Sequence, residues 1–192
     1  NDIDTLRSEM SKTAGELSTL RGAKIPSIEK ELQELLHQVG LVNAVVTFEH
    51  ITQPDQFQET GIDKIQILFS GNKGSAPVPI HKAASGGELS RLMLCIKYIM
   101  ARTTALPTLI FDEIDTGISG EVALKVSTIM KAMSKQHQVF AITHLPQIAG
   151  KGEHHFFVHK QTENNTTVTS IRALSEEERP LEIAKMIGGE KP

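Results

Sequence analysis

Two short apolar segments, residues 106–111 and 138–142, place the tightest constraint on how this chain of 192 residues can fold. A continuously apolar run of this length is typical of a strand that is buried in a parallel sheet. Residues 119–133, which lie between them, have helical periodicity, and residues 145–149 predict a further short helix. The order strand, helix, strand, helix predicts a right-handed crossover and a mainly parallel sheet with flanking helices, which is an α/β fold.

The rest of the chain adds further helices and strands, which we infer from helical periodicity, alternation of apolar residues and turn-forming residues. A polar loop at 161–165 predicts a hairpin close to the C-terminus. The expected elements are strands at 44–51 and 62–69, a loop at 71–79, a helix at 85–102, hairpin strands at 153–159 and 166–172, and a last helix that opens at Ser175 and stops at Gly188-Gly189.

The first 40 residues carry apolar side chains at a heptad spacing. The seam comprises Ile3, Leu6, Met10, Leu17 and Leu20, with Thr13 in the gap. We expect Pro26 to interrupt this helix, and a second helix with the same spacing to end near Gly40. Two interpretations stay open, an amphipathic helix pair packed on the domain or the root of a longer coiled coil. Both predict a helical or coiled-coil stub at 1–40 and a main domain at 41–192.

Composition argues against several classes of protein. The formal net charge is −3 and Lys and Arg form no contiguous run, so the whole chain is no obvious polyanion binder. Its apolar stretches are far shorter than the roughly 20 residues of a membrane helix, and no signal peptide is visible. The single cysteine, Cys95, fits core packing and a reducing cytoplasm. The start at Asn1, inside a charged periodic segment, resembles a cut through a longer protein.

A glycine-rich motif, SGGELSR, opens the helix expected at 85–102. Ser85 and Glu88 have the spacing of a capping box, which would stabilise the start of the helix without any ligand. A cap needs no glycines, however. Gly86 and Gly87 would let a ligand approach free backbone N–H groups at the positive end of the helix. The motif therefore predicts a phosphate site as the alternative to a simple cap.

Two carboxylates, Asp112 and Glu113, end the first apolar segment. They could form an ordinary solvated turn, but parallel α/β sheets bind their ligands at the carboxyl ends of strands. In the functional interpretation Asp112 supports Mg²⁺, usually through water, because this ion prefers oxygen ligands and keeps part of its hydration. Glu113 then orients and polarises an attacking water.

The loop at 114–120 directly follows these carboxylates. It is either a glycine-rich turn in which Asp115 or Ser119 caps the next helix, or a polar loop that reaches the nucleotide of another subunit. Its position next to Asp112 and Glu113 favours the second interpretation.

His144 follows the second apolar segment with Thr143 between them, and we expect this segment to pair with the strand that bears Asp112. From that edge of the sheet it could hydrogen-bond a γ-phosphate. The other seven histidines are expected to be structural or solvent-exposed. A metal site at His154, His155 and His159 is disfavoured, because no cysteine or acidic ligand lies at a useful spacing.

In their order and approximate spacing these segments resemble the signature loop, Walker B segment, D-loop and switch histidine of ABC ATPases. Within that superfamily the chain resembles the RecN family, which is SMC-like. The resemblance is carried by ASGGELSR at 84–91, FDEIDTGISG at 111–120, THLPQIA at 143–149 and EIAKMIGG at 182–189. GISG and HLPQ separate it from transporter ATPases and from SMC heads.

The resemblance implies the C-terminal lobe of an ABC-ATPase head in a bacterial protein of DNA double-strand-break repair and recombination. The implied cofactors are ATP and Mg²⁺. The implied partners are DNA (by analogy its ends or single-stranded regions), the N-terminal lobe of the same protein, and a second copy in an ATP-sandwiched dimer, with no membrane. The implied location is the bacterial cytoplasm, in association with the nucleoid.

The resemblance also assigns roles to the motif residues. Asp112, Glu113 and His144 would complete the P-loop site of their own head. Ser85, Gly86, Gly87 and Glu88 would cap the γ-phosphate bound in a partner head, and Asp115 would lie near that interface.

A P-loop, Gly-x-x-x-x-Gly-Lys followed by Ser or Thr, does not occur in the sequence. The only Gly-Lys pair is Gly150-Lys151, and Gly152 follows it. We therefore expect this chain to be inactive as an ATPase by itself. Two other functions stay open, a transporter ATPase and a clamp in which ATP governs head association without hydrolysis. Glu113 favours hydrolysis over the clamp.

Overall fold

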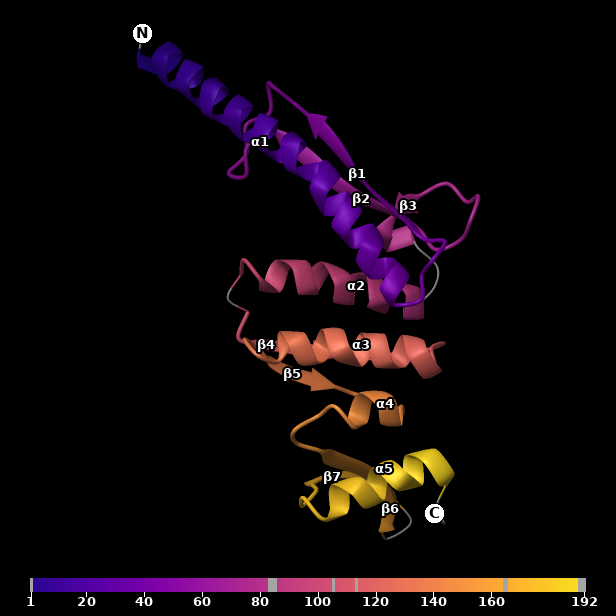
Figure 1. Ribbon diagram of the computed structural model, residues 1–192. Helices are drawn as coiled ribbons and strands as arrows, with labels where there is room; N and C mark the ends of the chain where they lie inside the picture. The colour runs from indigo at the N-terminus through magenta and orange to yellow at the C-terminus, as the bar shows by residue number, and fades with distance from the viewer. Residues whose placement is uncertain (1, 83–85, 105, 113, 164–165, 190–192) are drawn as a thin grey trace. The chain divides into compact units, whose positions relative to one another are not determined.

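The computed structural model describes residues 2–82, 86–104, 106–112, 114–163 and 166–189 (Figure 1). The chain divides into two compact units, Asn1–Ile96 and Lys97–Pro192, which we describe separately. Within the described ranges no helix is long and apolar enough to cross a membrane. The expected division of the chain at residue 40 stays a prediction.

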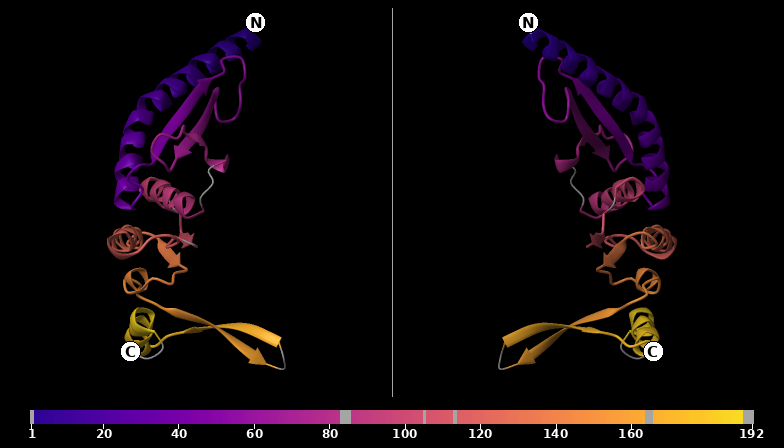
Figure 2. Two further views of the ribbon diagram at one scale, coloured as in Figure 1. Left: turned by 90° about the vertical axis from the view of Figure 1, so that its right-hand side faces the viewer. Right: turned by 90° about the vertical axis from the view of Figure 1, so that its left-hand side faces the viewer.

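The first unit begins with one continuous helix, α1 (Asp2–Gln38). The expected break at Pro26 is wrong, because this proline lies inside the helix. Proline cannot donate to the carbonyl four residues before it, here that of Gly22, but a helix that curves can absorb the lost bond. Figure 2 shows α1 curving along the neighbouring strands. The burial of Leu32 and Leu36 beyond the proline adds packing energy that keeps the helix intact.

A small antiparallel sheet lies beside α1. It contains β1 (Val45–Thr52), β2 (Asp63–Ser70) and the short β3 (Val78–Pro79), which a 3-10 turn, Ile80–Lys82, follows. Val46 pairs with Phe69 and Thr52 with Asp63 in the register of β1 and β2. The strands expected at 44–51 and 62–69 are thus confirmed to within one residue.

Polar side chains of α1 bind the backbone around β1. Glu29 Oε1 accepts a hydrogen bond of 2.7 Å from the Phe48 N–H. Gln33 Nε2 donates to the Ala44 carbonyl oxygen at 2.6 Å. These bonds satisfy backbone groups that would otherwise need water, so they fix the strand on the helix.

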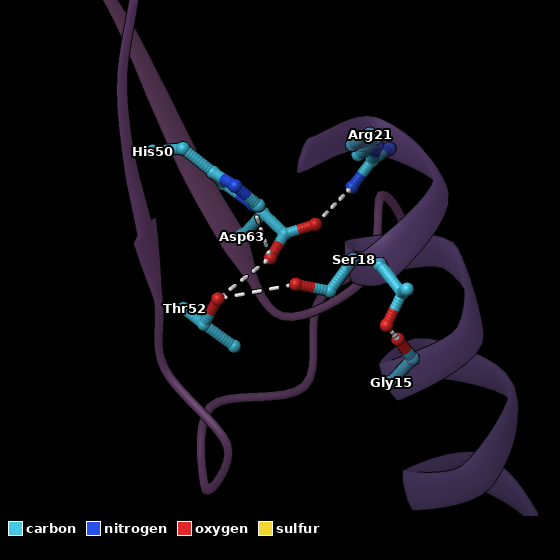
Figure 3. Close-up of polar contacts among 7 residues, drawn as sticks. Gly15, Ser18, Arg21, His50, Thr52 and Asp63 are labelled. Carbon is cyan, nitrogen blue, oxygen red and sulfur yellow. Dashed lines mark hydrogen bonds and ion pairs between the residues drawn. The ribbon is translucent and has the colours of Figure 1, made fainter. Parts of the chain in front are cut away.

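A buried carboxylate, Asp63, ties the far end of the hairpin to α1 (Figure 3). Its side chain has no exposed surface, and its Oδ2 accepts a hydrogen bond of 3.1 Å from Arg21 Nη1. His50 Nε2 lies 2.9 Å from Oδ1. This contact counts as an ion-pair contact and not as a hydrogen bond. Thr52 Oγ1 donates to Oδ1 at 3.4 Å and lies 3.1 Å from Ser18 Oγ.

Helix α2 (Gly86–Ala101) spans the boundary between the units. The elements that follow are β4 (Thr108–Phe111), α3 (Gly120–Met133), β5 (Gln138–Ala141) and α4 (Pro146–Ala149). β4 and β5 pair in parallel, with Phe111 opposite Ala141. This confirms the predicted strand–helix–strand unit. The other described strand pairs are antiparallel.

The two faces of the β4–β5 pair differ in exposure. Leu109 and Phe111 on β4 are buried, whereas Ile110 between them is 61% exposed. Phe140, opposite Ile110 on β5, and Ile142 are exposed as well. One face of this small sheet is therefore covered, and the other is apolar and bare within the described part of the chain.

The chain ends in the predicted hairpin and helix. β6 (Phe156–Glu163) pairs with β7 (Thr166–Ala173), and α5 (Glu178–Gly188) follows. Ser175 and Glu178 exchange hydrogen bonds. The Ser175 N–H donates to Glu178 Oε2 at 2.9 Å, and the Glu178 N–H donates to Ser175 Oγ at 3.3 Å. This reciprocal pattern is that of a capping box, and it explains why the helix opens at this serine.

Candidate functional site

The candidate site lies at the carboxyl end of the parallel strands in the second unit. The Ile142 N–H donates to the Phe111 carbonyl oxygen at 2.9 Å, which extends the pairing by one residue beyond β5. Asp112, which is exposed, follows β4 directly. Thr143 and His144 follow β5. The parallel register thus brings the ends of both predicted motifs to one edge of the sheet.

Asp115 joins the two loops that leave this edge. Its side chain is 4% exposed. Oδ2 accepts hydrogen bonds from Thr143 Oγ1 at 2.6 Å and from the His144 N–H at 2.8 Å. His144 Nδ1 lies 3.1 Å from the same oxygen. The loop after β4 is therefore bound to the loop after β5 through one carboxylate.

His144 combines a fixed backbone with an open side chain. The imidazole is 74% exposed although its Nδ1 faces Asp115. The Leu145 N–H donates to Thr143 Oγ1 at 3.0 Å, which further defines the turn before α4. The remaining ring nitrogen, Nε2, is thus available to a ligand at the edge of the sheet.

The helix-capping alternative for the loop at 114–120 is wrong in its details. Ser119 is the N-cap residue of α3, but its side chain makes no capping hydrogen bond. Asp115 binds the loop after β5 instead. Gly117 and Gly120 have φ angles of 73° and 53°, so this loop needs glycine for its backbone conformation as well.

The available donors fit Mg²⁺ bound with nucleotide better than they fit a dedicated metal site. Among the described residues no three His, Cys, Asp or Glu side chains form a metal-binding group. Asp112 offers a hard oxygen ligand at the exposed edge, and Mg²⁺ is commonly held by one or two carboxylates together with waters and phosphates. Glu113, the predicted catalytic carboxylate, and Ser85 of the glycine-rich motif lie outside the described residues.

The described part of the glycine-rich motif lies in the first unit. Gly86 and Gly87 open α2, and a Cβ added at Gly86 would meet no atom within 4 Å. The Glu88 carboxylate lies against Gly71, where a Cβ would overlap it. Glu88 therefore packs on the loop after β2. Arg91, one turn further on, is buried, and burial lowers the pKa of its guanidinium.

Thr143 is the residue at this site that sequence reasoning missed. Its hydroxyl makes the shortest contact to Asp115. The one signal for it in the sequence is a hydroxyl residue between the second apolar segment and His144.

Curated proteins match nearly the whole chain. It is 38% identical over 181 residues to the DNA repair protein RecN of Haemophilus influenzae, which covers 94% of this chain and 32% of that protein. It is 42% identical over 192 residues to RecN of Rickettsia conorii, covering 98% of this chain and 35% of that protein. The chain thus spans about a third of the length of these relatives. No protein-family model matches.

Solved structures of SMC head domains share the fold. An SMC head from Pyrococcus furiosus, solved with an extended coiled coil and the C-terminal domain of ScpA, has a TM-score of 0.60 at 17% identity and covers 96% of this chain and 44% of that one. The SMC head with a coiled coil from Pyrococcus yayanosii has a TM-score of 0.57 at 20% identity over 82% of this chain and 28% of that one. This chain accordingly has the fold of part of an SMC head domain, in agreement with the fold class that the sequence predicts.

Proposed function

Since this chain is a RecN-family segment, we propose that it forms the C-terminal lobe of an ATP-binding and ATP-hydrolysing head in a bacterial protein of DNA double-strand-break repair and recombination. The observation that carries this proposal is the edge where Asp112 and His144 follow two parallel strands, with Asp115 joining their loops. Such an edge is where α/β sheets bind nucleotides.

Each residue at this edge has a separate task in hydrolysis. Bound ATP and Mg²⁺ would supply the scissile phosphoanhydride bond and the metal ion that neutralises its charge. Asp112 would hold the ion, in part through water. Glu113 accepts a hydrogen bond from the attacking water and so directs its lone pair at the γ-phosphorus. His144 contacts a γ-phosphate oxygen through Nε2.

The glycine-rich motif serves a second head. The start of α2 at Gly86 and Gly87 presents N–H groups and the positive end of the helix dipole to an anion, and Ser85 is assigned to the same site from the sequence motif. The γ-phosphate in a partner head is the anion we assign to it, with Glu88 in support. ATP then joins two copies of the protein, and hydrolysis releases them.

The rest of the head comes from a part of the protein that supplies the P-loop, which this sequence does not contain. The bare apolar face of Ile110, Phe140 and Ile142 supports this proposal, because exposed side chains of this kind commonly mark an interface. That N-terminal lobe is the occupant we expect, and the isolated chain should hydrolyse no ATP.

DNA is the proposed partner of the whole protein, in keeping with the names of its relatives. We expect engagement of DNA ends or single-stranded regions, coupled to ATP-dependent dimerisation of heads, on the nucleoid in the bacterial cytoplasm. Stimulation of ATP turnover by DNA, rather than by a membrane protein, separates this function from that of a transporter ATPase.

The decisive test measures phosphate release by the longer protein that contains this chain, with and without linear DNA. We expect Glu113→Gln to slow turnover by about 10²–10⁴-fold, because a positioned base is lost, and to leave ATP binding intact. Glu121→Gln is the matched control, since Glu121 is an exposed residue of α3 paired with Lys125, and it should hydrolyse ATP at the wild-type rate.

Two results would contradict the proposal. Unchanged turnover in Glu113→Gln would remove the catalytic assignment. ATP-dependent dimerisation without any phosphate release in the wild type would instead identify a clamp that ATP closes and that does not hydrolyse it.

A further inference from the structure

We propose that Asp115 is a positioning residue for His144, which holds the imidazole with Nδ1–H toward the Asp115 carboxylate and Nε2 toward the ligand. The effect on ATP turnover rests on the function proposed above. The tautomer and orientation of the ring do not, because both can be measured without nucleotide.

The geometry around Asp115 Oδ2 carries this inference. The oxygen receives the Thr143 hydroxyl and the His144 N–H, and His144 Nδ1 lies 3.1 Å away. An ionised carboxylate can only accept hydrogen bonds, so a nitrogen at this distance must carry a hydrogen to be favourable. Because the Asp115 side chain is 4% exposed, water cannot easily replace these donors.

The carboxylate selects one tautomer of the ring. A neutral imidazole carries one N–H, and a partner at one nitrogen decides which nitrogen has it. With Nδ1–H on Asp115, Nε2 carries the lone pair and faces outward from a ring that is 74% exposed. To donate to a phosphate oxygen, Nε2 must also carry a hydrogen.

This arrangement makes the charge of Asp115 matter, in addition to its shape. An asparagine could still accept hydrogen bonds from the Thr143 hydroxyl and the His144 N–H through its amide oxygen. Its neutral amide oxygen is, however, a weaker acceptor for Nδ1–H than a carboxylate oxygen. Asp115→Asn therefore separates the positioning of His144 from the simple packing of two loops.

The first readout is spectroscopic. The longer protein is prepared without nucleotide and with ¹⁵N only in histidine, and the two-bond couplings of the neutral His144 ring identify its tautomer. His144→Gln assigns the signal. We expect Nδ1–H in the wild type and a smaller fraction of Nδ1–H in Asp115→Asn, because a neutral amide oxygen is a weaker acceptor than a carboxylate. An Nε2–H ring in the wild type would overturn the proposal.

The second readout is the division of the effect between kcat and KM. We expect Asp115→Asn to lower kcat by about 10–100-fold while the KM for ATP changes by less than about threefold, because an orienting partner is lost rather than a binding contact. Thr143→Val is the comparison variant. It removes the hydroxyl's bonds to Asp115 and to the Leu145 N–H, keeps both His144 contacts, and should preserve the tautomer with a smaller loss of kcat than Asp115→Asn.

Equal losses of kcat in Thr143→Val and Asp115→Asn, with one unchanged tautomer, would show that Asp115 only packs the loops and would overturn the proposal. A wild-type protein that releases no phosphate but has the Nδ1–H ring would refute the proposed function alone. The two failures are thus distinguishable.

Discussion

Individual buried side chains hold the helices and strands of each unit together. The side chain of Asp63 has no exposed surface and joins α1 to both strands of the β1–β2 hairpin. Nothing in the local sequence distinguishes this residue, because its partner Arg21 is 42 residues away. A buried carboxylate is stable only when donors surround it, so the cluster fixes how the hairpin lies on the helix.

Asp63 should make the first unit sensitive to acid. Burial raises the pKa of its carboxyl, but the contacts with Ser18, His50 and Arg21 together outweigh burial and lower the pKa from 3.8 to about 2. Since the folded-state pKa is the lower one, the stabilisation is fully present above about pH 4–5 and is lost as the pH falls toward 2. The contribution of the Asp63 carboxylate to the free energy of unfolding is about 1–2 kcal/mol.

Urea unfolding of wild type and Asp63→Asn at several pH values checks this prediction. We expect the variant to unfold at lower urea near pH 6, and the difference to shrink below pH 4. Asp55→Asn, in the exposed loop between β1 and β2, serves as a control with little effect. A difference that stays constant from pH 6 to pH 2.5 would contradict the prediction.

At the scale of the element, the sequence predicts most helices and strands to within one to three residues, because apolar periodicity reflects the face that each one buries. The helix over residues 2–38 is the exception. A proline rule is local, whereas the packing of Leu32 and Leu36 and the hydrogen bonds of Glu29 and Gln33 to the region of β1 depend on residues further along the chain.

His137 should stabilise the connection between three elements of the second unit. Its Nδ1 lies 2.5 Å from the Leu106 carbonyl oxygen and its Nε2 lies 3.1 Å from that of Ala101. A neutral imidazole carries one N–H, so one of these carbonyl oxygens accepts a hydrogen bond from it. His137→Leu removes that donor and leaves the carbonyl unsatisfied, at a cost of about 1–3 kcal/mol. His137→Gln keeps one possible donor and should cost less. Equal losses in urea unfolding would show that ring packing, not hydrogen bonding, is responsible.

The arrangement of the elements also explains which part of the candidate site could be predicted from the sequence. Asp112 and His144 each come after an apolar strand of the parallel pair, so the parallel pattern alone brings them to one edge. The inward direction of Asp115 could not be predicted, because it depends on Thr143, 28 residues away. From the sequence alone, a loop rich in glycine and polar residues could equally well cap a helix, lie at an interface or bind a neighbouring loop of the same chain.

At the scale of the whole molecule, this chain spans about a third of its relatives and keeps apolar surface exposed in both units. Ile110 on the bare face of β4 and Val45 on β1 are examples. These surfaces could not be predicted from the sequence. The residue type is apolar in either case, whether the side chain packs against this chain or against another part of the protein.

The bare face of β4 predicts a difference between this chain and the longer protein. Ile110→Ser should change the free energy of unfolding of the 192-residue chain by less than about 0.5 kcal/mol, since Ile110 is exposed here. In the longer protein it should cost about 1–3 kcal/mol, because the side chain would be covered by the N-terminal lobe.

Leu109→Ala is the control for this comparison, because Leu109 is 3% exposed and the variant should be destabilised by about 2–5 kcal/mol in both proteins. Calorimetric melting of the four variant proteins and the two wild types measures the effect. Equal effects of Ile110→Ser in the two contexts would mean that the N-terminal lobe covers some other surface.

The unbroken helix α1 also has a mechanical consequence. A helix of 37 residues is about 55 Å long, and its backbone hydrogen bonds, of which Pro26 removes one, make it stiff along its axis. Arg21, Glu29 and Gln33 attach this helix to the hairpin at three heights. A push or twist applied near Asp2 is therefore not dissipated in a hinge at Pro26. It is transmitted to the β1–β2 hairpin. The helix α1 therefore acts as a lever on the strands to which it is bound.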